Sequence, residues 1–456
     1  MKRNSGLLLV LILSLSACSV VSPEVAGTLA PVVCSEEERH WWRVFGDETL
    51  NKLALRLRGQ SIDIRTAHVR INQARAIETE TMSGLLPVIL ASASQQRTNA
   101  QVPIPFTVGL QRGTLDAAWE LDLFGRVRAE AESAQYGRIS RELEAEAVEM
   151  AVTAELVRLY AEWKLQHRIR ESTEQGCANS SRRLEITRQL VSSGRNDRRD
   201  LERVAFESSQ WHALRQAAES ELINAQLRLE RLFGVLPGEL HHDLGDAAFQ
   251  LPLVVMPQVV LERELIRARA RPEIRYASAQ LYRRAADLRV TEAALWPRVT
   301  IGGFWGAQDL SVPAVAAANP IWAFSQSASL PILNFGRLQA AVDVADSELQ
   351  IALLEYQRAV SSALTTTREA AEQYLNQTNQ YQQVQEQLAQ INQLVRAERL
   401  RFKAGMTGED VPLEQTLAMH RQSIALVLVE ISLVSQYARF QKEIGFCGPD
   451  ESVVNL

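Results

Sequence analysis

The sequence predicts a mainly α-helical chain with a β part of membrane-spanning length, arranged as an internal two-fold repeat. Three observations predict this fold class. Landmark motifs recur at a nearly constant offset, the stretch from Phe124 to Gly194 contains no proline, and four segments have the length and alternation of strands. An ordinary globular domain does not need a helix of that length.

The repeat is visible in pairs of landmarks that lie 210 or 211 residues apart. The pairs are Pro87 with Pro297, Gly125 with Gly336, Gly194 with Gly405 and Gly234 with Gly445. A constant offset over most of a chain indicates one structural unit present twice. We therefore expect a first repeat over 47–236, a linker with three prolines over 237–257, a second repeat over 258–445 and a C-terminal tail over 446–456.

Each repeat is expected to contain a helix, a β-hairpin and two long helices. The expected helices cover about 47–84, 124–194 and 198–233 in the first repeat, and about 261–295, the stretch from the hairpin to Gly405, and 410–444 in the second. At 1.5 Å per residue, the second of them is on the order of 100 Å long.

The long helices carry the apolar spacing of a coiled coil. One seam is Leu143, Ala147, Met150, Ala154, Val157 and Ala161, and another is Leu417, Ile424, Leu428, Ile431 and Ala438. Seams rich in Ala bury little area per contact, so we expect many helices packed side by side. A plain long-helix scaffold would share these features, so the helices alone do not define a function.

Four segments predict strands in two hairpins, at about 88–119 and 299–333. They are Val88–Gln101, Phe106–Trp119, Val299–Leu310 and Trp322–Leu333, with prolines expected to break each hairpin. A tilted strand of roughly 9–11 residues crosses a bilayer. The smallest membrane barrels have about eight strands, so two copies of the chain would give eight strands and three would give twelve. Solvent-exposed hairpins are the alternative. Trp296, Trp305 and Trp322 argue against this alternative, because tryptophans at these positions could anchor the strands at the membrane interface.

The N-terminus has the layout of a lipoprotein signal. Lys2 and Arg3 precede a short apolar run that ends in Leu15-Ser16-Ala17-Cys18, a lipobox-like sequence. We expect a signal peptide over 1–17, lipidation of Cys18 and a lipidated tether over 18–46. An ordinary secretory signal with a coincidental cysteine is the alternative. The residue after the cysteine is Ser19, which favours the outer membrane over retention at the inner one.

The remaining cysteines are Cys34, Cys177 and Cys447. The periplasm permits disulfides, and Cys34 and Cys447 lie near opposite ends of the mature chain. A disulfide between those two is one hypothesis, and buried free thiols are the other.

The chain carries no motif for catalysis or nucleotide binding. A formal net charge of −5 argues against a nucleic-acid partner. The H-E-x-x-H, G-x-x-x-x-G-K-[ST] and G-x-S-x-G patterns do not occur. His241-His242 is better explained as a solvated pair in the linker than as a metal site. We therefore expect no enzyme activity, no cofactor and no bound metal, and after the signal no transmembrane helix.

Several motifs together resemble a known family. They are Trp41-Trp42-x-x-Phe45-x-Asp47-x-x-Leu50, Trp119-Glu120-Leu121-Asp122-Leu123-Phe124-Gly125-Arg126-Val127-Arg128, Arg271-Pro272-Glu273-Ile274 and Leu330-Pro331-Ile332-Leu333-Asn334-Phe335-Gly336-Arg337. The set, in this order, resembles TolC-type outer membrane factors, in particular the NodT-type lipoprotein branch. The resemblance runs from the lipobox to about Gly445.

The resemblance implies a homotrimeric duct, in which three chains form a twelve-stranded barrel continuous with a helical barrel through the periplasm. It implies an outer membrane exit channel of a tripartite efflux pump, with a periplasmic adaptor protein and an inner-membrane transporter as partners. A type I protein secretion duct and a lipid-anchored structural coiled coil are the alternatives. We interpret Phe124, Gly125, Arg126 and their counterparts Phe335, Gly336, Arg337 as structural junctions between strand and helix.

The helix tips are the candidate functional residues. By analogy with the family, Gly194 and Gly405 mark the periplasmic turns, and Asp410 and Glu414 are candidates for an acidic gate at the entrance. The alternative for these two acids is stabilisation of a helix start by the helix dipole. Arg195, Asp197 and Asp200 form the tip of the first repeat and are candidates for contacts with the adaptor or for intersubunit salt bridges.

Overall fold

The computed structural model describes residues 40–100, 106–241, 243–244, 271–312 and 315–445. The described residues form two compact units, and each unit draws on both repeats. One contains Asn72–Arg141 and Arg275–Gln357, and the other contains residues 40–71, 142–274 and 358–445 as far as they are described. Cys18, Cys34 and Cys447 lie outside the described residues, so the lipidation and the disulfide remain predictions.

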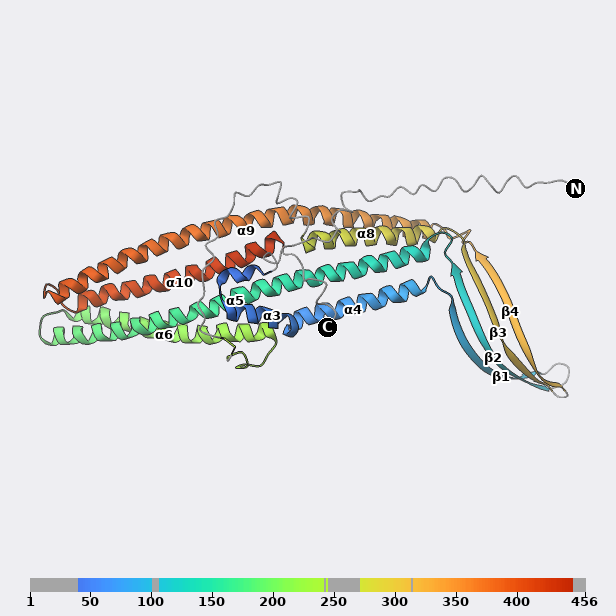
Figure 1. Cartoon of the computed structure of the whole chain (residues 1–456), viewed down its shortest axis with the longest axis horizontal. Helices are drawn as coiled ribbons and strands as arrows, with labels where there is room; N and C mark the ends of the chain where they lie inside the picture. The colour runs from blue at the N-terminus through green and yellow to red at the C-terminus, as the bar shows by residue number, and fades with distance from the viewer. Residues whose placement is uncertain (1–39, 101–105, 242, 245–270, 313–314, 446–456) are drawn as a thin grey trace. The chain divides into compact units, whose positions relative to one another are not determined.

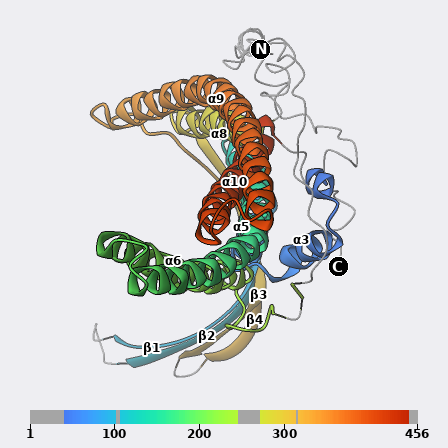
Figure 2. The same cartoon turned by 90° about the vertical axis from the view of Figure 1, so that its left-hand side faces the viewer.

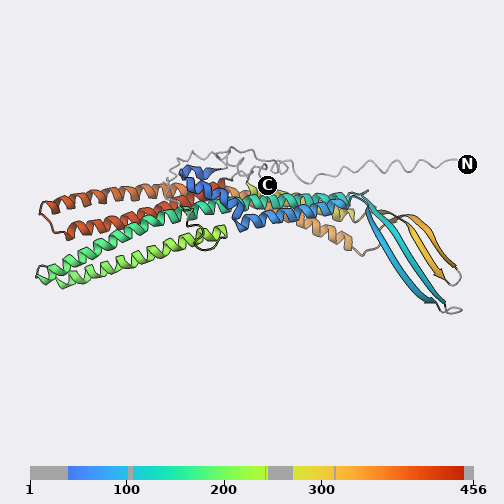
Figure 3. The same cartoon turned by 60° about the horizontal axis from the view of Figure 1, so that its bottom comes forward.

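The two-fold repeat is confirmed by matching pairs of helices. Figure 1 shows α5 running back along α6 and α9 running back along α10, and Figures 2 and 3 show both pairs from other directions. Counterparts agree in length, at 67 residues for α5 and α9 and 22 residues for α4 and α8. The elements are α4 (Ile62–Ser83), α5 (Arg126–Ser192), α6 (Arg198–Phe233), α8 (Pro272–Ala293), α9 (Arg337–Lys403) and α10 (Asp410–Ile444).

The expectation of one helix over 47–84 was wrong. The structure has α3 (Glu48–Gln60) and α4, separated by Ser61. The Ser61 N–H still donates to the carbonyl of Leu57, but its ψ of 125° is extended, so the chain turns before α4 begins. Gly59 lies two residues before the break, but no proline is present and the helical pattern continues on both sides of it.

The unit that contains α3, α6 and α10, called the helical unit below, encloses a core. The segment before α3 belongs to this core. Trp41 and Phe45 lie in a short 3₁₀ helix, Trp41–Phe45, and are buried, although they were expected to belong to the tether. Asp47 caps α3 by accepting from the N–H groups of Thr49 and Leu50 at 2.8 and 3.2 Å. The carboxylate also accepts from the Tyr160 hydroxyl at 2.7 Å, which fastens this segment to α5.

The seam predicted on α5 is confirmed, and the seam on α10 is confirmed only in part. Five of the six α5 positions are buried and Ala147 is half-buried. On α10, Leu417 and Ala438 are buried, but Leu428 is 53 % exposed. The side chains that face the core there are Leu426, Val427, Leu433 and Val434. Because α10 is apolar on several faces, spacing alone could not select the buried one.

Helix α10 is also long and apolar enough to cross a membrane, by length and composition. Packing in the helical core accounts for this apolar character, because Leu417, Leu433 and Val434 are fully buried there. The apolar window therefore needs no membrane to explain it.

Four antiparallel strands form one sheet in the order β1-β2-β3-β4. They are β1 (Val88–Ala100), β2 (Phe106–Leu121), β3 (Arg298–Val312) and β4 (Val315–Ser329). The two hairpins are joined by the pairing of β2 with β3, so the sheet of one chain ends in two open edges, β1 and β4.

The bounds predicted for the fourth strand were wrong. It was expected over Trp322–Leu333, but β4 covers Val315–Ser329 and includes Pro320, which lies opposite Ala307. Proline is tolerated on an edge strand because its missing N–H can face away from the ladder. β4 is such an edge within one chain, so Pro320 did not interrupt it.

Candidate functional site

The two faces of the sheet differ in polarity. Residues opposite each other in a ladder share a face, so the register Leu115–Trp305–Trp322 places three apolar side chains in one row. The face that contains this row also carries Ile89, Trp119, Ile301 and Phe324. These side chains project away from the chain: Trp322 is 75 % exposed and Trp305 66 %.

The other face of the sheet is richer in polar residues, although it also carries Leu90, Leu110, Phe304 and Ile321. It carries Ser92, Ser94, Arg112, Thr114, Asp116, Glu120, Thr300, Gln308, Ser325 and Ser327. Its side chains interact with one another: Thr114 donates to Asp116 at 3.1 Å, and the Thr300 and Ser327 hydroxyls lie 2.7 Å apart. Alternation of apolar and polar residues with a period of two is the pattern of a strand between lipid and water.

The first strand-to-helix junction is held by charged residues. Gly125 has a φ of +78°, which L side chains rarely adopt, so the sharp change from β2 to α5 depends on it. Asp122 caps α5 by accepting from the N–H groups of Val127 and Arg128, both at 3.0 Å. Burial raises the pKa of Asp122, but hydrogen bonds from Arg128 and Val127 outweigh it, so the pKa lies below its ordinary value.

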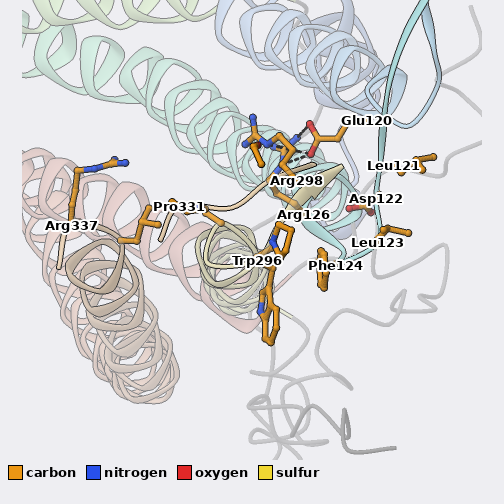
Figure 4. A pocket seen from close by; sticks show the side chains of 15 residues that line it. Glu120, Leu121, Asp122, Leu123, Phe124, Arg126, Trp296, Arg298, Pro331 and Arg337 are labelled. Atoms are coloured by element: carbon orange, nitrogen blue, oxygen red, sulfur yellow. Dashed lines mark hydrogen bonds and ion pairs between the residues drawn. The ribbon is translucent and has the colours of Figure 1, made fainter. Parts of the chain in front are cut away.

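A cavity of about 270 Å³ lies beside this junction, lined by residues from both repeats. Figure 4 shows Arg126 and Arg298 next to Glu120, and Phe124 next to Trp296. Arg126 donates to both Glu120 oxygens, and the Phe124 and Trp296 rings stack with centroids 5.4 Å apart. The stacked rings connect the two hairpins, and the Arg126–Glu120 pair fastens β2 to α5, as expected for a structural junction.

The second junction shares the positive φ of its glycine with the first but differs from it in the preceding residue and in its chemistry. Gly336 has a φ of +84° and its N–H donates to the Asn334 side chain at 3.1 Å. Leu333 stands where the first repeat has Asp122, so α9 begins without that carboxylate cap. Phe335 has a φ of +52° and is 91 % exposed. The sequence predicted the position of this junction but not its exposed apolar surface.

Both helix tips turn with the same backbone hydrogen bonds. The Gly194 N–H donates to Val191 and that of Arg195 to Leu190, at 3.0 and 2.8 Å. The Gly405 N–H donates to Phe402 and that of Met406 to Arg401, both at 2.9 Å. This pattern is a Schellman motif, and φ values of +72° and +73° at the two glycines complete it. The predicted tips are therefore equivalent in structure.

The two tips differ in their polar side chains. At the first, Asp197 caps α6 by accepting from the Arg199 N–H at 3.3 Å, and Asp200 pairs with Arg203 at 3.3 Å. Arg195 is exposed. At the second, Asp410 lies in the first turn of α10, where the helix dipole favours an acid, and makes no ion pair within the described part of the chain.

Glu414 belongs to a group of ion pairs that connects the two repeats. Arg183 of α5 donates to Glu414 of α10 at 2.7 Å and to Glu207 of α6 at 2.5 Å. Arg421 of α10 also reaches Glu207, at 2.5 Å. We call Arg182, Arg183, Glu207, Glu409, Glu414 and Arg421 the tip ion network.

A second pair in this network lies nearer the surface. Arg182 donates to both Glu409 oxygens, at 3.0 and 2.8 Å. The hydrogen bonds and charge of Arg182 lower the pKa of the Glu409 carboxyl. Arg183–Glu414 therefore joins α5 of the first repeat to α10 of the second, and Arg182–Glu409 joins α5 to the residue just before α10.

Sequence reasoning missed Arg183 and its partners. A signal was present, because Ser180, Arg183 and Thr187 are spaced by three and four residues and all are buried. An arginine in a buried seam needs an acidic partner, since an uncompensated buried charge is costly. Which acid it pairs with depends on the approach of α6 and α10, and a single sequence does not contain that information.

Comparison with known proteins gives one consistent result. The model of a family described as outer membrane efflux protein matches residues 53–235 and 266–445, once in each repeat. The pyoverdine export outer membrane protein OpmQ of Pseudomonas putida is 25 % identical, over 96 % of both chains. The toluene efflux pump outer membrane protein TtgC of Pseudomonas putida is also 25 % identical, over 90 % of this chain and 85 % of that one. The solved outer-membrane channel OprN is similar in structure, with a TM-score of 0.80, 25 % identity and coverage of 91 % of this chain and 94 % of that one.

Proposed function

Because this chain belongs to the family of outer membrane efflux proteins, we propose that it forms the exit duct of a tripartite efflux pump. The duct is a passive conduit that carries small toxic compounds from the periplasm across the outer membrane. An inner-membrane transporter supplies the energy and a periplasmic adaptor protein joins the two. The relatives support this role by name, since OpmQ is a pyoverdine export protein and TtgC belongs to a toluene efflux pump.

The alternation between the two faces of the sheet carries the proposal. The face with Leu115, Trp305 and Trp322 contacts lipid, and the face with Thr114, Asp116 and Gln308 lines a water-filled pore. Exposed tryptophans and a separate polar face have no purpose in a structural coiled coil. The strands, of 13 to 16 residues, exceed the roughly 9–11 that a tilted crossing requires.

The open edges of the sheet require several copies of the chain. A lipid-exposed strand edge leaves backbone polar groups without partners, so a membrane sheet must close into a barrel. Two copies would close eight strands and three would close twelve. We propose the homotrimer, because the motifs around Phe124-Gly125-Arg126 and Phe335-Gly336-Arg337 resemble those of trimeric TolC-type factors.

The tip ion network lies where the closed entrance is proposed. Asp410 and Glu414 have different roles there. The charge of Glu414 is balanced by Arg183, so this acid holds the α9–α10 hairpin against α5 in the closed state. Asp410 makes no ion pair among the described residues, and three-fold symmetry would place three such carboxylates around the axis, where they attract cations.

The tips also present the surface proposed for the adaptor. Gly194 and Gly405 fix the turns, and Arg195, Asp197 and Asp200 are polar side chains at the first of them. In the N-terminal segment of the sequence, lipidation of Cys18 would hold the tether in the outer membrane. The burial of Trp41 and Phe45 supports this arrangement, because it fastens the end of the tether to the helical core.

Deletion of the chain followed by a susceptibility panel of drugs, dyes, detergents and metal salts tests this function. We expect sensitivity to several small compounds and restoration by the wild-type chain. Retained resistance together with loss of a secreted protein would instead favour a type I secretion duct. Unchanged resistance and unchanged secretion would favour a structural coiled coil.

A further inference from the structure

The cavity beside the first junction, called the junction cavity below, lies on the polar face of the sheet. Glu120, Arg298 and Ser329 line it, and all three belong to the polar face in the strand register. Arg126 and Arg337, from the starts of α5 and α9, line its other side. Its volume of about 270 Å³ is near the lower end of the range for ligand pockets, roughly 300–1,000 Å³, so a small molecule has room there.

The carboxylates of the junction cavity already have partners. Glu120 accepts from Arg126 with both oxygens, at 2.9 and 2.8 Å. Asp122 accepts from the Nε atom of Arg128 at 2.9 Å, in addition to capping α5. These are the two acids among the residues that line the cavity. Neither carboxylate is therefore left for another cation of the cavity.

Two guanidinium groups at the junction cavity lack a counter-charge of their own. Arg298 approaches Glu120 only to 3.7 Å, which is too long for a hydrogen bond. Arg337 makes no ion pair in the part of the chain that the structure describes. Both arginines are exposed to solvent, and Figure 4 shows them on either side of Pro331. The cavity therefore carries uncompensated positive charge.

The second junction has the arginine of the first but not its acids. Arg337 lies 211 residues after Arg126, at the equivalent position. Arg126 is held by Glu120 and by Glu130. The counterparts of these two acids, at the same offset, are Pro331 and Ala341. Holding a strand to a helix, as Arg126 does, therefore does not account for the charge of Arg337.

We propose that the junction cavity binds the anionic group of a small compound, a carboxylate, sulfonate or phosphate, with Arg298 and Arg337 as donors. A guanidinium presents a planar fork of N–H groups that matches the paired oxygens of such groups. The dipole at the start of α9 adds to the attraction. This inference rests on the proposed function and names a substrate class for it, because the polar face would line the pore of the duct.

The rest of the lining suits a compact apolar body attached to the anionic group. Trp296, Pro331 and Leu338 line the cavity, and Trp296 is 53 % exposed although it stacks on Phe124. An organic anion can contact these side chains, whereas an inorganic anion cannot. Because the arginines are exposed, water and salt weaken the attraction. Binding is therefore weak enough for release, as passage through a pore requires.

Binding of para-fluorobenzoate to the purified oligomer tests the site. The neutral para-fluorobenzamide has nearly the same shape and serves as the control ligand. Fluorine NMR detects weak binding through broadening of the ligand signal. We expect the wild-type protein to bind the benzoate and not the amide. Equal binding of the two ligands would overturn the proposal, because the cavity would then not recognise charge.

Arg298→Gln and Arg337→Gln test the two donors separately. Each variant should raise the dissociation constant of para-fluorobenzoate about ten-fold, because it removes a hydrogen bond to a charged group. Arg188→Gln is the matched control: Arg188 is an exposed arginine of α5 that pairs with Glu185 at 3.9 Å, away from the cavity lining. Its binding should equal that of the wild type. Unchanged binding in both cavity variants would overturn the proposal.

Pro331→Glu examines the role of the missing acid while both arginines remain. This variant places at the second junction the carboxylate that the first junction has in Glu120, so Arg337 gains a counter-charge within the chain. We expect para-fluorobenzoate binding to be lost without a lower unfolding temperature. Retained binding in Pro331→Glu would contradict the proposal that Arg337 is available because it lacks an acid.

A membrane lipid is the other source of an anionic group, and competition distinguishes it from a solute. Short-chain phosphatidylglycerol and its soluble headgroup, glycerol phosphate, are each added against bound para-fluorobenzoate. A site for solutes predicts displacement by both. Displacement by the lipid alone would overturn the substrate class. An oligomer that binds neither probe nor competitor would overturn the site and leave the duct in place, whereas absence of an oligomer would contradict the proposed function.

Discussion

Arg183 on α5 donates a 2.7 Å hydrogen bond to Glu414 on α10, although Arg183 belongs to the first repeat and Glu414 to the second. The arginine is buried, whereas the Glu414 side chain is 52 % exposed. Glu207 on α6 holds the other side of the guanidinium. A bond of this kind joins the two long hairpins of one chain near their tips, so opening of the proposed entrance requires it to break.

Glu414→Gln should favour the open state of the channel. The variant removes the charge that Arg183 binds, and a hydrogen bond to a charged group contributes about 1.5–3 kcal/mol. Loss of about 1.5 kcal/mol from the closed state raises the ratio of open to closed by roughly ten-fold. The measurement is mean conductance of the reconstituted protein in a planar bilayer.

Glu221→Gln is the matched control for Glu414→Gln. Glu221 pairs with Arg228, but both residues lie on α6, so this bond does not join the repeats. The mean conductance of Glu221→Gln should therefore equal that of the wild type. Equal conductance of Glu414→Gln and the wild type would show that the Arg183–Glu414 bond does not hold the entrance closed.

Asp410→Asn should change the selectivity of the channel between cations and anions rather than the ratio of its open to closed state. Asp410 lies in the first turn of α10 and makes no ion pair within the described ranges, so its charge remains available to permeating ions. We expect the ratio of cation to anion permeability, measured from the reversal potential in a salt gradient, to fall in this variant. An unchanged reversal potential would leave only the helix-dipole role for Asp410.

A lysine substitution should have different effects on assembly when it is placed on the two faces of the sheet. Leu115 lies near the middle of β2 on the apolar face, and Gln308 lies near the middle of β3 on the polar face. A lysine against lipid near the midplane costs about 2–4 kcal/mol, and one in a water-filled lumen costs little. Leu115→Lys should reduce the amount of oligomer in the outer membrane, and Gln308→Lys should not. The opposite order would reverse the assignment of the faces.

The helical unit should lose stability in mild acid through His420. Burial, and then the charge of Arg399 on α9, lower the pKa of this imidazole, and Asn179 on α5 lies 3.3 Å from its Nε2 atom. A histidine whose folded-state pKa is lowered contributes stability that is fully present above its unfolded pKa of about 6.5 and is lost as the pH falls below that value.

Thermal unfolding between pH 7.5 and pH 5 measures the contribution of His420. The wild type should unfold at a lower temperature in acid, and His420→Gln should reduce this dependence because it cannot take up a proton. A parallel pH dependence of the two proteins would assign the acid sensitivity to other groups, such as the carboxylates of the tip ion network.

Sequence reasoning predicted the elements that depend on local pattern. The offset of 211 residues between Gly125 and Gly336 and the absence of proline after Phe124 were enough to place α5 and α9. Gly194 and Gly405 were found because they recur at the same offset, and the structure gives both the left-handed backbone that a helix end favours. In each case the information lies within a few residues or in the repeat itself.

The misplaced features depend on distant neighbours. Pro320 is accepted in β4 because the strand is an edge, which is a property of the whole sheet. Leu428 is exposed because neighbouring helices cover other faces of α10. The pairing of Arg183 with Glu414 joins residues that are 231 positions apart in the sequence. The exposure of the Phe335 side chain depends on which other elements pack around the second junction.

Single-channel recording of the purified full-length protein in a planar bilayer tests the central claim most directly. A duct built from the sheets of several copies predicts discrete current steps. The open level should occupy more of the recording in Glu414→Gln, and steps should appear less often in Leu115→Lys. A protein that assembles into oligomers in detergent but passes no current, even as Glu414→Gln, would contradict the account.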